Sequence, residues 1–75
     1  MQNATSELWA VEELDRTQCP EWCVVGLYRS KESAREHGQC IVSNHSLGIH
    51  RRARIKRAPQ YVVDFWNMTG QHIGN

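Results

Sequence analysis

A run of basic side chains in the second half of the chain is the feature best suited to chemistry. Five of the nine Lys and Arg residues lie within residues 51–57. In a strand, alternate side chains share one face at a spacing of roughly 6.6–6.8 Å. Such a row suits the carboxylates of an acidic protein or the phosphates of a nucleic acid, and it also suits a solvated edge strand that resists aggregation. The first candidate partner-binding site is therefore His50, Arg51, Arg52, Arg54, Lys56 and Arg57.

Acidic side chains gather around the first expected loop and form a second candidate surface. They are Glu12, Glu13, Asp15 and Glu21. A catalytic pair of carboxylates needs a pocket that shifts the pKa of at least one of them, and no such pocket is indicated by the sequence. We expect either a solvated loop or a docking surface for a basic partner.

Three cysteines and a histidine have spacings that a zinc ion can use. Three residues separate Cys19 from Cys23, and two residues separate His37 from Cys40. Zinc takes four such ligands in a tetrahedron, and a small chain gains stability from it. Neither pair has the tight two-residue spacing between cysteines, however, and reduced cysteines also serve as small core residues. We expect no metal and no cofactor, with zinc as the alternative.

The elements that would position these residues begin with two strands and a helix. Residues 8–14 and 22–28 are rich in aromatic and β-branched residues, and their closeness in sequence favours an antiparallel hairpin. Ser30 is a helix N-cap, and an apolar stripe predicts a helix over residues 31–44. Gly38 either ends this helix or lies inside it, at a contact too close for a side chain.

A third strand is expected over residues 49–57, with Pro59 ending it. Residues 61–66 fit a strand or a helix, and the β-branched pair Val62 and Val63 favours a short strand. The order β-β-α-β, with a possible fourth strand, predicts an α+β fold in which one helix packs on one face of a small antiparallel sheet. We expect a single domain over residues 8–66, with flexible ends at residues 1–7 and 67–75.

Length and composition exclude several classes of protein. A chain of 75 residues and 8.7 kDa allows one domain, and no apolar run approaches the roughly 18–20 residues of a membrane span. The first residues lack the features of a secretory signal, and an odd number of cysteines argues against a disulfide framework. Common nucleotide-binding and hydrolase motifs do not occur. We therefore expect a cytoplasmic protein that is not an enzyme.

The net charge of +1 conceals an asymmetry along the chain. Residues 1–21 hold five acidic residues and one arginine, a net charge of −4, whereas residues 29–57 hold eight basic and two acidic residues, a net charge of +6. Acidic and basic faces can meet different partners. Most of the six aromatic residues are expected in the core, and an exposed Tyr61 or Trp66 would instead be a binding anchor.

Two segments carry a resemblance to a group of known proteins. The strings Leu-Trp-Ala-Val-Glu-Glu at residues 8–13 and Trp-Cys-Val-Val-Gly-Leu-Tyr-Arg-Ser-Lys-Glu-Ser-Ala at residues 22–34 resemble small early proteins of tailed bacteriophages. These proteins share an opening strand with aromatic and Val residues, a second strand ending in Gly-hydrophobic-aromatic, a Ser- or Thr-capped helix and a further strand. The resemblance covers residues 8–57.

The resemblance implies a protein that acts by stoichiometric binding. Some members are similar to inhibitors of host RNA polymerase, which occupy a polymerase surface with a charged sheet face or edge. Others look like anti-CRISPR proteins, which block CRISPR effector complexes, in some cases with a DNA-like acidic surface. Here a basic strand dominates instead. We expect a monomer or dimer in the bacterial host cytoplasm that inhibits RNA polymerase, with an anti-CRISPR protein or a small nucleic-acid-binding regulator as alternatives.

Overall fold

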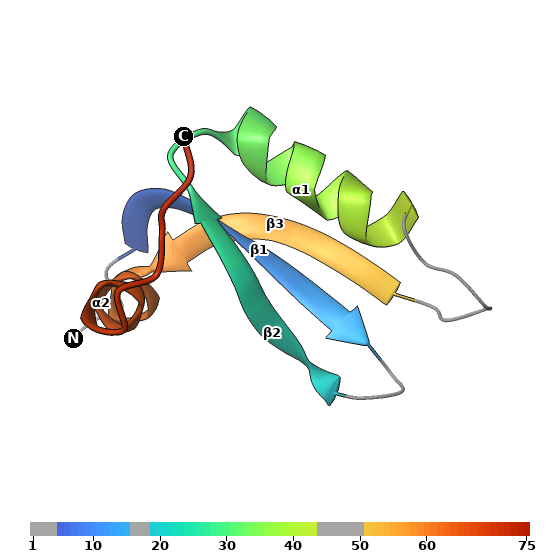
Figure 1. Cartoon of the computed structure of the whole chain (residues 1–75), viewed down its shortest axis with the longest axis horizontal. Coiled ribbons are helices and arrows are strands. Elements are labelled where there is room, and N and C mark those ends of the chain that lie inside the picture. Colours follow the sequence, from blue (N-terminus) through green and yellow to red (C-terminus); the bar gives the residue numbers. More distant parts are fainter. Residues whose placement is uncertain (1–4, 16–18, 44–50) are drawn as a thin grey trace.

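The protein is a three-stranded antiparallel sheet with a helix on each face (Figure 1). The computed structural model describes residues 5–15, 19–43 and 51–75. In chain order the elements are β1 (Thr5–Asp15), β2 (Cys19–Tyr28), α1 (Lys31–Ser43), β3 (Arg51–Pro59) and α2 (Gln60–Met68). The strand order is β2-β1-β3, so β1 is the central strand, and both pairings are antiparallel. The predicted α+β class and the hairpin of the first two strands are confirmed.

The first helix forms where the sequence predicts it. The Ser30 hydroxyl accepts a hydrogen bond from the backbone N–H of Ser33 at 3.2 Å, as an N-cap does. Ala34, Gly38 and Ile41 are its buried residues. Gly38 lies inside the helix, where an added Cβ would stand 3.2 Å from Cδ1 of Ile55. The alternative in which Gly38 marks a close contact is therefore the one observed.

Side chains of β1 feed a separate core on each face of the sheet, because successive side chains point to opposite faces. Val11 packs with Ala34 and Ile41 under α1. Its neighbour Ala10 packs on the other face, together with Leu27, Ala58, Val63 and Trp66. Both Val11 and Ala10 are 0% exposed, so the central strand is covered on both sides over this stretch.

The expected fourth strand is wrong, and so is the expectation of one helix. Residues 61–66 belong to α2, which begins directly after the extended Pro59 at φ −61° and ψ 147°. Helical spacing buries Val63 and Trp66 together against the sheet. This tertiary burial outweighs the weak strand preference of the β-branched pair. Pro59 is the last residue of β3, and residues 49 and 50 of the expected third strand lie outside the described residues.

The two ends of the described chain, which we expected to be flexible, both take part in regular contacts. Residues 5–7 belong to β1. Past α2 the chain returns to β2, where Gly74 donates a hydrogen bond to the carbonyl of Leu27 and accepts one from the N–H of Arg29, each at 2.9 Å. The indole N–H of Trp66 also donates to the carbonyl of His72 at 3.1 Å. These bonds attach the final residues to the domain.

Candidate partner-binding face

The two helices cover the sheet unequally, and this leaves part of one face open. In Figure 1, α1 runs along the upper side of the sheet, whereas α2 lies under one end of the other side. Beyond α2, that side continues through the register pairs Val24–Glu12 and Glu12–Arg54. We define the open sheet face as the side chains on this side beyond α2: Glu12, Leu14, Trp22, Val24, Arg52, Arg54 and Lys56.

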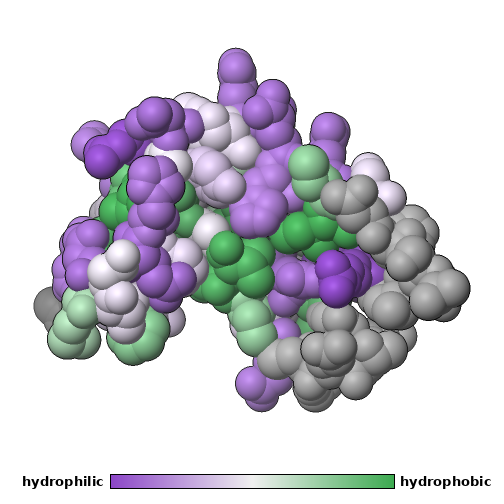
Figure 2. Space-filling view, viewed as in Figure 1, coloured by the Kyte–Doolittle hydropathy of each residue, from purple (hydrophilic) through white to green (hydrophobic). Residues whose placement is uncertain are grey.

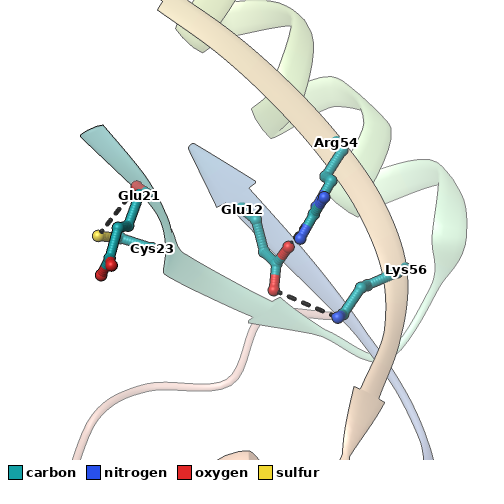
Figure 3. A network of polar contacts seen from close by, with 5 residues as sticks. All are labelled: Glu12, Glu21, Cys23, Arg54 and Lys56. Atoms are coloured by element: carbon teal, nitrogen blue, oxygen red, sulfur yellow. Dashed lines mark hydrogen bonds and ion pairs between the residues drawn. The ribbon is translucent and has the colours of Figure 1, made fainter. Parts of the chain in front are cut away.

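A buried carboxylate lies at the centre of the open sheet face. Glu12 is only 7% exposed, because it stands on the central strand between two neighbours. Two cations of β3 converge on it: Arg54 Nε forms an ion pair with Oε1, and Lys56 Nζ lies 3.7 Å from Oε2 (Figure 3). A buried charge needs such partners to offset its lost hydration. One residue of the predicted acidic surface and two residues of the predicted basic site therefore form one cluster.

The three basic side chains of the open sheet face differ in how firmly they are held. Arg54 places its guanidinium 4.2 Å from the centre of the Trp22 ring in addition to its ion pair with Glu12. It thus bridges all three strands and supports the sheet. Lys56 is tied to the same carboxylate at a longer distance. Arg52 is exposed and forms no ion pair within the described residues, so its donors are available to a partner.

The remaining basic residues of β3 lie on the side of α1. Arg51 Nε is 3.2 Å from Oε2 of Glu13. The Arg57 guanidinium lies 4.5 Å from the centre of the Trp9 ring, and Lys31 of α1 approaches the same ring at 5.1 Å. Alternation along the strand thus divides the predicted basic site into two groups that face opposite ways. His50 lies outside the described residues.

The second predicted surface, of acidic residues, is also divided. Glu12 and Glu13 pair with basic residues of β3 on opposite faces of the sheet. Glu21 is exposed on β2, and the backbone of Asp15 pairs with Cys19 and Arg51, but its side chain is outside the described set. On the open sheet face three cations stand against one carboxylate, an excess of two positive charges.

The proposed zinc ligands do not come together in the part of the chain that is described. Cys23 and Cys40 are exposed, on β2 and α1. Nδ1 of His37 is 2.9 Å from the hydroxyl of Tyr28, a hydrogen bond that occupies this nitrogen. No three His, Cys, Asp or Glu side chains among the described residues gather as metal ligands would. The side chain of Cys19 lies outside that set.

An apolar hollow that the sequence did not predict lies beside the open sheet face. It has a volume of about 520 Å³ and is lined by Val24, Tyr61, Val62, Phe65 and Trp66. Tyr61 is 73% and Phe65 55% exposed. In Figure 2 a hydrophobic patch over β2 borders a notch between α2 and the far end of the sheet. The helical spacing of residues 61 and 65 could have indicated that their side chains lie together, but a strand was predicted for this segment.

No protein-family model, no curated protein and no solved structure matches this chain. Among the described residues, neither helix is long and apolar enough to cross a membrane. The open sheet face, with its excess of positive charge, and the aromatic residues beside it are the candidate binding features among the described residues.

Proposed function

We propose that this protein is a non-enzymatic inhibitor that binds a nucleic-acid-processing machine of a bacterial host, with RNA polymerase as the first candidate target. The observation that carries the proposal is the part of the sheet that α2 leaves uncovered, where Arg52, Arg54 and Lys56 outnumber Glu12. Polymerase inhibitors of the phage group that the sequence resembles use a charged sheet face in this way. The mechanism is steric: the bound protein occupies a surface that DNA, a sigma factor or a moving domain requires.

An acidic protein surface suits the open sheet face better than a nucleic acid does. Arg54 and Lys56 are already paired with Glu12, and this lowers the positive charge that they can offer to a row of closely spaced phosphates. Arg54 and Lys56 share the Glu12 carboxylate, whereas Arg52 forms no ion pair with any residue that the structure describes. Because a guanidinium binds a carboxylate through two parallel hydrogen bonds, single acidic side chains of a protein are suitable partners.

The acidic residues of the chain argue against imitation of DNA. Glu12 and Glu13 are both paired with basic side chains of β3 and lie on opposite faces. An anti-CRISPR function, the alternative, would then also depend on the basic face docking onto a protein surface of the effector complex. A small nucleic-acid-binding regulator is the second alternative, in which Arg52 and Lys56 contact phosphates.

The test is affinity capture from a nuclease-treated bacterial lysate with tagged protein, followed by transcription assays with purified polymerase. We expect polymerase subunits to be enriched and transcription to be inhibited. Arg52→Glu should abolish both effects, whereas Arg35→Glu, an equal charge change at an exposed position of α1, should leave both unchanged.

Three outcomes would contradict the proposal. Capture that depends on nucleic acid, together with salt-dependent binding to bare DNA, would favour the regulator. Capture of a CRISPR effector complex would favour the anti-CRISPR function. Equal loss of capture in both charge variants would show that the open sheet face is not the contact.

A further inference from the structure

We infer that the open sheet face and the apolar hollow form one groove, which binds a protein segment carrying a bulky apolar side chain flanked by carboxylates. This inference rests on the proposed function and names the chemistry of the partner's contact segment. Two neighbouring features with different chemistry support it: an apolar pocket wall at α2 and an excess of positive charge on β3.

The hollow and the charged cluster are joined by one cross-strand pair. Val24 lines the hollow, and it is the register partner of Glu12, on which Arg54 and Lys56 converge. Side chains that stand directly opposite in antiparallel strands have Cβ atoms about 4.5–5.5 Å apart. An apolar side chain in the hollow would therefore place the flanking residues of its segment beside the cations of β3.

The apolar end of the groove has the residues of a binding anchor. Tyr61 and Phe65 are one helical turn apart on α2 and project from it largely exposed, while Val63 and Trp66 on the same helix are buried. Single exposed apolar residues are common on protein surfaces. Here two aromatic rings instead border a hollow of about 520 Å³ floored by Val24 and Val62. Aromatic residues in this setting contribute strongly to protein interfaces.

The basic end of the groove selects carboxylates. Arg52 lies two residues before Arg54 on the same face of β3, and its five N–H donors form no ion pair within the described residues. A carboxylate there can be bound in the bidentate manner and meets an excess of two positive charges.

Two other occupants fit the groove less well. A second copy presenting the same face would bring two surfaces with an excess of positive charge together, and like charges repel. A nucleic acid would find two of the three cations already paired with Glu12, and Arg54 occupies one face of the Trp22 ring, on which a base could stack. A protein segment that combines acidic and apolar residues satisfies both ends of the groove.

The experiment is an NMR titration of the ¹⁵N-labelled full chain with a synthetic probe peptide in which Asp and Glu residues surround one Phe. We expect saturable shifts at Val24, Arg52 and Phe65 and none at Gln39 on α1. A peptide with Ala in place of Phe should bind about tenfold more weakly, because the buried ring is lost. A peptide with Lys in place of the acidic residues should not bind.

Matched variants of the protein separate the groove from the general surface. Phe65→Ser should weaken binding of the acidic peptide about tenfold. Met68→Ser is the control, because Met68 is 77% exposed on the same helix and does not line the hollow. Both residues are exposed, so circular dichroism should show an unchanged fold. Arg52→Glu should also abolish binding.

Several results would overturn the inference. Equal affinity for the Phe and Ala peptides would show that charge alone is recognised, and shifts centred on α1 would place the contact elsewhere. Single-stranded DNA that competes at the same residues would favour a nucleic acid, and self-association in ultracentrifugation would favour a second copy. Absence of peptide binding, with polymerase capture intact, would refute the groove alone. Peptide binding without capture of any machine would refute the proposed function alone.

Discussion

The two faces of the sheet differ in how much of each is covered by a helix (Figure 1). On the α1 face a helix of 13 residues crosses the sheet and closes a core around Val11, Ala34 and Ile41. On the opposite face α2 has nine residues and closes only one end, around Ala10, Leu27 and Trp66. Beyond the part that α2 covers, this face of the sheet carries charged side chains and Trp22 instead of core residues. Helix length and position thus decide which part of the sheet remains uncovered (Figure 1).

The largest effect is expected from a cavity in the core under α2. Leu27 is 1% exposed and is the largest fully buried side chain among the described residues. Leu27→Ala should lower the free energy of unfolding by about 2–5 kcal/mol, from lost burial and the cavity left behind. Chemical denaturation measures it. A loss below about 1 kcal/mol would show that this end of the face is not a close-packed core.

The second-largest effect on stability is expected when the ion pairs of the open sheet face are removed. Glu12→Gln keeps the shape of the side chain but removes the carboxylate that Arg54 and Lys56 share, and should cost about 1–3 kcal/mol of unfolding free energy. Glu13→Gln is the matched control, since its pair with Arg51 is more exposed, and should cost about 0–1 kcal/mol. If chemical denaturation gave the same loss of unfolding free energy for both variants, the ion pairs of Glu12 would be no more stabilising than the pair of Glu13.

The close contact between α1 and β3 is tested at Gly38. An added Cβ would already lie 3.2 Å from Cδ1 of Ile55, so Gly38→Leu should push α1 away from the sheet. We expect a loss of about 1–3 kcal/mol despite the better helix propensity of leucine. Thermal unfolding monitored by circular dichroism measures the loss. A stabilised variant would show that α1 packs more loosely than the contact implies.

The smallest effect on stability is expected at Tyr61, an exposed aromatic residue of the hollow. Tyr61→Ser changes a side chain that is 73% exposed, so the unfolding free energy should change by no more than about 0.5 kcal/mol. Binding of the acidic peptide should nevertheless weaken, because Tyr61 lines the hollow. A large loss of stability without a loss of binding would show that Tyr61 supports the fold and does not contact the peptide.

The sequence by itself determined the parts of the fold that rest on local pattern. Strand-forming residues at 8–14 and 22–28 predicted the hairpin, although both strands begin three residues earlier than expected. The cap at Ser30 and the stripe through Ala34 and Ile41 predicted α1 to within one residue of its observed end. Period-two alternation likewise predicted that Arg52, Arg54 and Lys56 share one face. Each of these features depends on residues close together in the chain, so no tertiary information was needed.

The tertiary structure alone decided which of these residues meet. It turned residues 60–68 into a helix because Val63 and Trp66 find a sheet face to pack against. It also brought Glu12 of the central strand between Arg54 and Lys56, residues more than 40 positions away, and so merged two surfaces that the sequence had kept apart. Strand order sets which charges become neighbours, and that order is a property of the folded sheet rather than of any local pattern.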